Sequence, residues 1–172
     1  EDTDAFVKRV LRDERQQDQE SIKAMQLGTD IHDAIEHGLK GESFNPALGV
    51  YVNPVLALPM LQGITNCEKI LFGDGYAGRV DCISDLDGTI YVVDFKTTKS
   101  VPKKDSWADH KLQTSAYARA LGDVGDNRIV TANVYISTTD PGLISVFEQT
   151  DWLDTYKAFE AVKTYWYWLN RL

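Results

Sequence analysis

The chain has 172 residues, of which 43% are hydrophobic and 26% are charged. This length suits one ordinary domain with a full hydrophobic core, and the composition is that of a soluble globular protein. No apolar run approaches the roughly 18–20 residues that span a bilayer, and no signal peptide is visible, so we expect no association with a membrane. The formal net charge of −8 disfavours a protein that coats nucleic acid through its overall charge, but it allows local handling of DNA.

The chain has two cysteines, Cys67 and Cys82. They are too few for a disulfide framework or a Cys-rich zinc site. An iron–sulfur cluster would need about four thiolates, so none is expected. We interpret both as small buried residues in a reducing compartment.

The N-terminal part of the chain is predicted to form helices within residues 4–40. Residues 4–26 lack Gly and Pro and carry apolar residues at helical spacing. Gly28 is expected to interrupt this helix, and Thr29 to cap a second one. Residues 42–63 contain three prolines and show no clear period, which indicates an irregular crossing with one short strand near residues 50–52.

The middle of the chain has the pattern of a sheet. Asp87-Gly88, between two apolar runs, is a strong hairpin signal. Further helices are predicted over residues 107–121 and 151–172. Five runs rich in β-branched and aromatic residues are predicted strands: residues 69–72, 76–86, 89–97, 128–137 and 143–147. The expected fold is α/β, a single domain over residues 1–172 with a mixed sheet of about five strands flanked by helices and a core of about residues 64–148.

The central hairpin brings two carboxylates together. If residues 87–88 are its two loop residues, counting down the ladder places Asp81 directly opposite Asp94, with Cβ atoms about 4.5–5.5 Å apart. The same count places Arg79 opposite Lys96. Two facing carboxylates among apolar neighbours require a positive charge between them. Mg²⁺ or Mn²⁺ could supply this charge. The alternative is that Arg79 and Lys96 form salt bridges with the two carboxylates at the end of the sheet.

Four ordered motifs resemble a known family. Residues 78–81 (Gly-Arg-Val-Asp) and, after the hairpin, residues 94–97 (Asp-Phe-Lys-Thr) resemble the core of the PD-(D/E)XK nuclease superfamily. Gly28-Thr29-x-x-His32 upstream and Gln113-x-x-x-Tyr117 downstream resemble additions found in its RecB-type branch. The resemblance implies a restriction-endonuclease-like core with DNA as substrate.

The resemblance also implies roles for individual residues. His32, Asp81 and Asp94 would bind the metal ion, together with the backbone carbonyl of Phe95. Lys96 would position the attacking water and stabilise the charge that builds on the phosphate.

Other residues are expected beside this centre. Glu68 matches an acidic residue often present in the branch and is a further catalytic candidate. Gln113 and Tyr117 would help to place the strand or the catalytic lysine, although either could simply cap the sheet. Four lysines in a locally positive segment are predicted to contact substrate phosphates, an ordinary solvated loop being the alternative: Lys99, Lys103, Lys104 and Lys111.

Two further expectations concern residues outside the motifs. His37 and His110 are predicted to be solvated surface. The aromatic residues at helical spacing near the C-terminus are predicted to be mostly core: Trp152, Tyr156, Phe159 and Trp166.

The sequence thus favours a Mg²⁺- or Mn²⁺-dependent DNA exonuclease acting on single strands or strand ends in replication, recombination or repair. The alternatives are a structure-specific or flap endonuclease of the same fold and a non-catalytic DNA-binding module. Without cluster cysteines, the chain looks most like compact phage or mitochondrial genome maintenance exonucleases. That implies the cytoplasm of a bacterium or phage-infected cell, or else the mitochondrial matrix, and a recombination or replication protein as partner.

Overall fold

The structure, a computed structural model, describes the backbone of residues 3–170 and the side chains of residues 19–170. Its helices are α1 (Thr3–Leu39), α2 (Gly49–Leu56), α3 (Ala108–Ala120) and α4 (Trp152–Asn170). Its strands are β1 (Ile64–Gly73), β2 (Tyr76–Leu86), β3 (Thr89–Thr98), β4 (Arg128–Ser137) and β5 (Ile144–Gln149). None of the helices in this range is long and apolar enough to cross a lipid bilayer. The predicted domain and its last helix reach residues 1–2 and 171–172, which lie outside the described residues.

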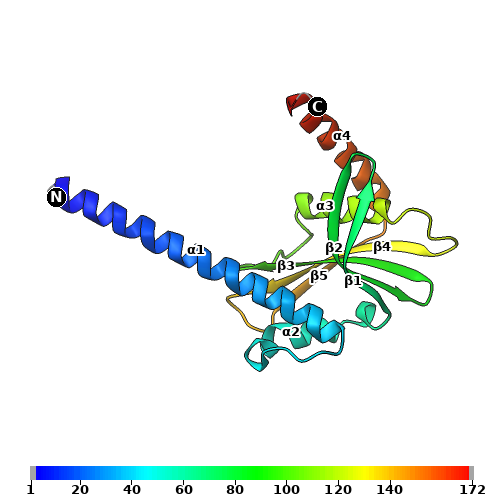
Figure 1. Cartoon of the computed structure of the whole chain (residues 1–172), viewed down its shortest axis with the longest axis horizontal. Coiled ribbons are helices and arrows are strands. Elements are labelled where there is room, and N and C mark those ends of the chain that lie inside the picture. Colours follow the sequence, from blue (N-terminus) through cyan, green and yellow to red (C-terminus); the bar gives the residue numbers. More distant parts are fainter. Residues whose placement is uncertain (1–2, 171–172) are drawn as a thin grey trace.

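The five strands form one mixed sheet in the order β1-β2-β3-β4-β5 (Figure 1). β3 and β4 are parallel and are connected through α3, whereas the other neighbours are antiparallel. All but the first two residues of β4 are buried, as expected for an inner strand that is covered on both faces. The prediction of a mixed five-stranded sheet flanked by helices is confirmed.

Helices cover both faces of this sheet. Ile31 of α1 and Val52 of α2 pack in one buried cluster with Val93. Tyr117 of α3 packs in a second cluster with Val92. Neighbouring residues of β3 therefore face opposite layers, which is the two-residue alternation of a strand that is buried on both faces.

The N-terminal region differs from its prediction in two places. α1 is one continuous helix, and Gly28 lies inside it without a break. A Cβ at Gly28 would lie 2.8 Å from Thr97 Oγ1, so the glycine permits close contact between α1 and β3. Residues 50–52 are not a strand but part of α2, because Val52 and Val55 lie three residues apart and both bury completely against the core.

The C-terminal helix also differs, because no residue of α4 is buried. The prediction of a mostly core aromatic face is therefore wrong, and Trp166 is about half exposed. α4 extends away from the body (Figure 1), although Lys163 and Tyr167 in its second half donate to the backbone oxygens of Asp74 and Gly75 in the β1–β2 turn. Its first turns pack on the sheet layer. There Trp152 packs on the α3 cluster and Phe159 contacts the ring of Tyr76.

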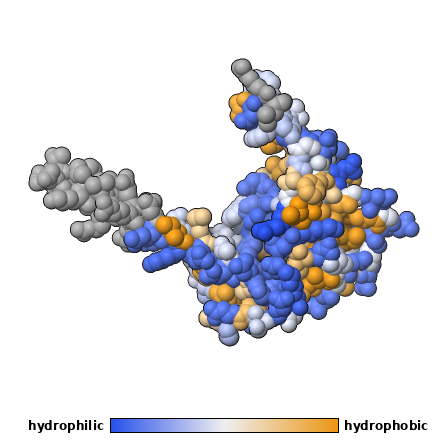
Figure 2. All heavy atoms as spheres, viewed as in Figure 1, coloured by the Kyte–Doolittle hydropathy of each residue, from blue (hydrophilic) through white to orange (hydrophobic). Residues whose placement is uncertain are grey.

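The surface is mixed in character. On the face shown in Figure 2, hydrophilic residues spread over much of the body and hydrophobic residues form separate patches. The exposed large hydrophobic side chains of the described residues include several on α4 and one, Trp107, immediately before α3.

Candidate active site

The hairpin register agrees with the sequence count over its paired length. Leu86 pairs with Thr89 and the ladder continues to Cys82 opposite Val93, where the pairing of β2 with β3 ends. Beyond that point β2 pairs only with β1, so the predicted pair of Arg79 with Lys96 does not form. The strands separate because the side chain of Asp81 accepts the backbone N–H of Phe95 (2.7 Å from N to Oδ2), a donor that would otherwise serve the ladder.

A row of polar residues crosses four strands at this point. Cys67 pairs with Cys82 and Lys69 with Val80, so Glu68 on β1 is level with Asp81 on β2. The β2–β3 ladder stops one position short of Asp81 and Asp94, so the predicted direct pair of these aspartates is not part of it, and the Phe95 N–H links Asp81 to β3 instead. Asn133 on β4 pairs directly with Asp94.

The row is locally irregular at its first strand. Glu68 has a φ of 52°, a left-handed conformation that side-chain-bearing residues adopt rarely. Its carboxylate Oε2 lies 2.6 Å from Arg79 Nε, an ion pair that does not have hydrogen-bond geometry. On β2, Cys82 packs on the α1 side, whereas Val80 and Ile83 both pack on the α3 side, so regular alternation fails next to Asp81.

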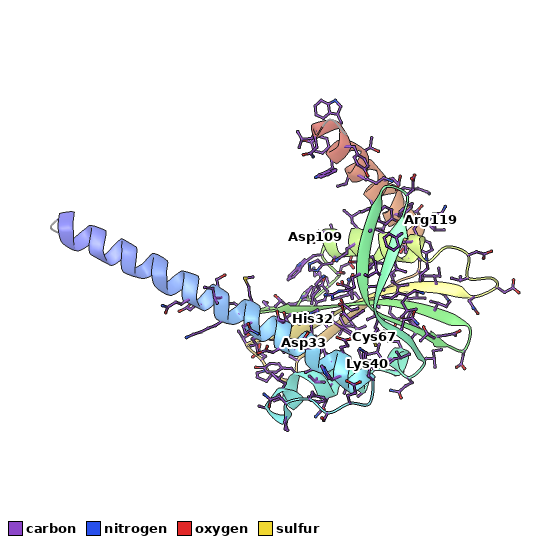
Figure 3. All side chains as sticks on the ribbon, in the orientation of Figure 1. His32, Asp33, Lys40, Cys67, Asp109 and Arg119 are labelled. Carbon is purple, nitrogen blue, oxygen red and sulfur yellow. The ribbon has the colours of Figure 1, made fainter. Side chains whose placement is uncertain are left out.

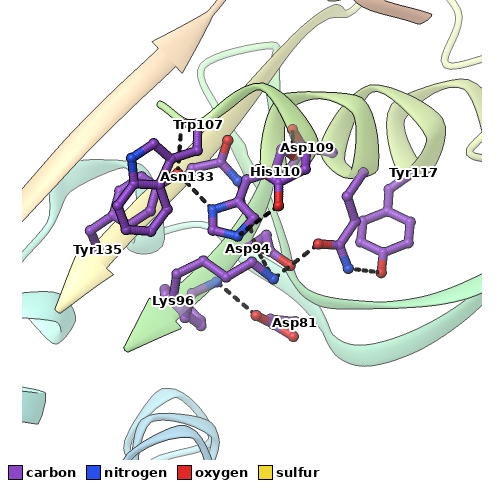
Figure 4. A network of polar contacts seen from close by, with 12 residues as sticks. Asp81, Asp94, Lys96, Trp107, Asp109, His110, Tyr117, Asn133 and Tyr135 are labelled. Atoms are coloured by element: carbon purple, nitrogen blue, oxygen red, sulfur yellow. Dashed lines mark hydrogen bonds and ion pairs between the residues drawn. The ribbon is translucent and has the colours of Figure 1, made fainter. Parts of the chain in front are cut away.

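Lys96 is held by a chain of hydrogen bonds that ends on α3 (Figure 4). Its Nζ lies 2.8 Å from Asp94 Oδ2 and donates to Gln113 Oε1 at 2.9 Å. Gln113 Nε2 donates to the hydroxyl of Tyr117 at 2.7 Å. A Cβ at Gly78 would lie 2.5 Å from the Tyr117 ring, so this glycine lets the tyrosine lie against β2. The structure thus brings together the predicted lysine, one carboxylate and both predicted α3 residues.

His32 lies on the part of α1 that crosses the sheet (Figure 3). Its Nδ1 lies 3.8 Å from Asp81 Oδ2, and its ring contacts Phe95 edge-on with centroids 6.3 Å apart. Both His32 and Asp81 line a cleft of about 610 Å³ between α1 and the first three strands. Glu68 and Arg79 line the same cleft, as do Asp33 and Glu36 of α1, so six charged or titratable side chains meet there.

The electrostatics of the centre follow from its burial. Asp94 is only 2% exposed, and burial followed by the negative charge of Asp81 raises its pKa against the opposing effect of Lys96. Burial also raises the pKa of Asp81, although the N–H of Phe95 and the charge of Lys96 lower it. Burial lowers the pKa of His32, which favours the neutral imidazole that binds metals. Two carboxylates that disfavour each other's charge gain from a nearby cation.

The donor types suit a divalent cation, with carboxylate oxygens and one imidazole. In the described part of the chain, however, no three His, Cys, Asp or Glu side chains converge closely enough to hold an ion without adjustment. The Lys96 ammonium is the counter-charge of Asp94 in this arrangement. The contact between Phe95 and Asp81 is made by the Phe95 N–H, and a role for its carbonyl stays a prediction.

The predicted lysine rim divides into two kinds of residue. Lys99, Lys103 and Lys104 are exposed in the loop between β3 and α3. Lys111 is partly buried and forms an ion pair with Asp105, which reduces the charge it can offer to a phosphate. The structure does not bring Lys111 and the loop lysines into one cluster through any contact it describes.

A buried network beside Asp94 was not foreseen (Figure 4). Tyr135 is fully buried, and its hydroxyl contacts Ser106 Oγ at 2.7 Å and His110 Nδ1 at 2.8 Å. Ser106 Oγ donates to Asn133 Oδ1 at 2.8 Å, and Asn133 Nδ2 lies 3.5 Å from Asp94 Oδ2.

His110 therefore belongs to the surroundings of the site, and the prediction of a solvated surface residue is wrong for it. Burial lowers its pKa. A sequence signal for the network does exist, since β4 has polar residues at alternate positions between apolar ones: Thr131, Asn133, Tyr135 and Ser137. His110 lies three residues before Gln113, on the same face of α3.

Comparisons with known proteins bear on the family of this chain. The family model described as the PD-(D/E)XK nuclease superfamily matches residues 60–163, which include β1 to β5, α3 and much of α4. Among solved structures, one titled "Crystal structure of SSO0001" is similar, with 20% sequence identity and a TM-score of 0.39 over 69% of this chain and 55% of that chain. The chain thus spans about half the length of that structure. No curated protein matches. On the strength of the family match, which covers the sheet and the carboxylate row, this chain belongs to the PD-(D/E)XK nuclease superfamily.

Proposed function

We propose that this protein is a metal-dependent DNA exonuclease of the RecB-type branch, acting on single strands or strand ends. The superfamily implies a nuclease that hydrolyses phosphodiester bonds in DNA. The observation that carries the proposal is the placement of the Lys96 ammonium between Asp94, at 2.8 Å, and Gln113, at 2.9 Å. The charge of Lys96 also acts on a second carboxylate, that of Asp81.

These residues divide the work of hydrolysis. Asp81 and Asp94, with His32 from α1, would hold Mg²⁺ or Mn²⁺, and the bound ion supplies Lewis-acid catalysis at the phosphate. Lys96 places a fixed positive charge where negative charge develops in the transition state. Gln113 and Tyr117 hold the ammonium in that place, so little reorganisation is needed during the reaction.

The shape of the site supports action on single strands or ends. The cleft of about 610 Å³ has the size of a small-ligand site, which suits a few nucleotides of one strand. Thr29 and His32 of α1 line one side, and Arg79 and Glu68 of the β1–β2 hairpin line the other.

The first prediction distinguishes an exonuclease from an endonuclease. With Mg²⁺ or Mn²⁺, the protein should degrade a linear single-stranded DNA and leave a closed circle of the same sequence intact, because digestion needs an end. Gel analysis of both substrates with a chelator control measures this. Linearisation of the circle at a comparable rate would contradict the exonuclease and favour the endonuclease.

The same assay tests the site. Asp94→Asn and Lys96→Ala should each lower the turnover on linear DNA by on the order of 10²–10³-fold, because each removes a charge that acts on the transition state. Lys157→Ala, in an exposed ion pair on α4, is the matched control and should retain full activity. Undiminished turnover by both site variants would refute the assignment.

A further inference from the structure

Trp107 is an exposed aromatic residue beside the carboxylate row. It immediately precedes α3, and it is 43% exposed. Its indole is flanked by two rings, Tyr135 at 76° and 5.1 Å between centroids and His110 at 59° and 5.3 Å. Steeply inclined rings support an indole without stacking against it in parallel, and they leave much of it open to solvent.

The segment that carries Trp107 is fixed to the sheet. The backbone N–H of Trp107 donates to the Tyr135 hydroxyl at 3.1 Å, and Ser106 contacts the same hydroxyl. Ser106 also bonds Asn133, the partner of Asp94 in the parallel β3–β4 pair. These buried polar groups thus fix the backbone at Trp107 relative to Asp94, and the rings of Tyr135 and His110 flank the indole itself.

The position along α3 places the indole next to the reaction centre. Trp107, His110, Gln113 and Tyr117 are spaced three, three and four residues apart, so they lie in one stripe of the helix. Gln113 bonds Lys96, and Trp107 lies about 9 Å before it along the helix axis. Figure 4 shows the indole, His110 and Lys96 on the same side of the sheet.

The charge nearby suits a nucleic-acid strand. Lys103 and Lys104 are exposed in the loop that leads to Trp107, and no ion pair within the described range involves them. In a protein with a net charge of −8, Lys103 and Lys104 thus supply exposed positive charge four and three residues before the indole, and phosphates are the groups that such charges contact in nucleic acids.

We propose that Trp107 is a stacking platform for a base of single-stranded DNA next to the scissile phosphate. This inference rests on the proposed function and deepens it by naming a residue that contacts a base of the substrate. Bases of a duplex already stack on their neighbours, whereas an unpaired base has a free face for the indole. Lys103 and Lys104 would contact the flanking phosphates, and the Tyr135 ring supports the indole from the side.

The test compares binding with and without bases. Fluorescence anisotropy would measure the affinity of the Asp94→Asn protein, in Mg²⁺, for a labelled oligothymidylate and for an abasic oligomer of equal length and charge. Trp107→Leu in this background should weaken oligothymidylate binding roughly 5- to 150-fold, the range of one stacked base, and leave the abasic oligomer unaffected. Trp107→Phe should retain part of the affinity. Trp168→Ala, at a 73% exposed tryptophan of α4, is the matched control and should change nothing.

Equal binding of oligothymidylate by the Trp107→Leu and parent proteins would overturn the proposal, and so would an equal loss for both oligomers or no binding by the parent. Trp107→Phe covers the case in which the leucine variant misfolds, because it keeps a ring and should still prefer oligothymidylate to the abasic oligomer. Cleavage by the wild-type protein is measured separately. A wild type that binds bases through Trp107 but never cleaves DNA would refute the proposed function and leave the stacking platform standing.

Discussion

Lys96, to which we assign a catalytic role as a proposal, is a partly buried charged residue. Its side chain is about one-quarter exposed, and its ammonium is held by a carboxylate on its own strand and an amide on α3. A lysine in such a place needs partners that offset the loss of hydration. The same partners fix its position, so the contacts that make its burial tolerable also pre-organise it for catalysis.

Removal of the Tyr135 hydroxyl tests how much the buried polar network stabilises the fold. Tyr135→Phe leaves Ser106, His110 and the Trp107 N–H without a shared partner, which should lower the free energy of unfolding by about 1–3 kcal/mol. Urea denaturation measures the change. Tyr91→Phe is the control, because the Tyr91 hydroxyl makes no hydrogen bond within the described residues, and it should change stability by under about 0.5 kcal/mol. Equal effects of the two variants would contradict the role of the network.

At the residue scale, the part of the site that lies on a single hairpin could be predicted from the sequence. The turn at residues 87–88 fixes the β2–β3 register as far as Cys82 and Val93, and Asp81 and Asp94 are the next residues on the two strands. His110 and Tyr135 belong to different elements, and their meeting depends on how α3 packs on β4. No local pattern specifies that packing.

At the scale of elements, the docking of α1 decides whether His32 reaches the carboxylates. Gly28 lies one turn before His32 and permits the approach to Thr97 of β3. In the sequence this glycine resembles a helix break, because its low helix propensity is visible and the strand it faces is not. For the same reason the prolines around α2 indicated an irregular crossing, while the buried Val52 and Val55 stabilise a short helix there.

Gly28→Ala tests the docking. The added Cβ would lie 2.8 Å from Thr97 Oγ1, so α1 should shift and carry His32 away from Asp81. Activity on linear DNA should fall on the order of 10²-fold, as expected for a displacement near 1 Å. The free energy of unfolding should change little, because alanine favours the helix over glycine by about 1 kcal/mol and this gain offsets the strain of the new contact with Thr97.

The double variant Gly28→Ala/Thr97→Ala removes the steric conflict and should recover activity to within a few fold of Thr97→Ala alone. Full activity of the single Gly28→Ala variant would show that the close contact has no functional role. A double variant as impaired as the single one would show that the glycine acts in some other way.

At the scale of the whole molecule, the sheet order and the two helical layers agree with the sequence pattern. The strands follow hydrophobic alternation and turn residues, and the parallel β3–β4 pair follows from a helix between two strands. The periodic aromatic residues of α4 were predicted to be mostly core, but none of them is buried. A periodic apolar pattern does not show whether a helix packs on the core along its whole length or extends away from it. α1 lies over the first strands of the sheet, and the cleft between them is lined by His32, Glu68 and Asp81.

The proposed metal centre is tested most directly by a crystal of the protein soaked in Mn²⁺, with anomalous scattering recorded for the wild type and for Asp94→Asn. We predict an anomalous peak within coordination distance of Asp81, Asp94 and His32 in the wild type, and its loss in the variant. No peak at this position, or a peak of equal strength in the variant, would contradict a metal-dependent nuclease centre built on these residues.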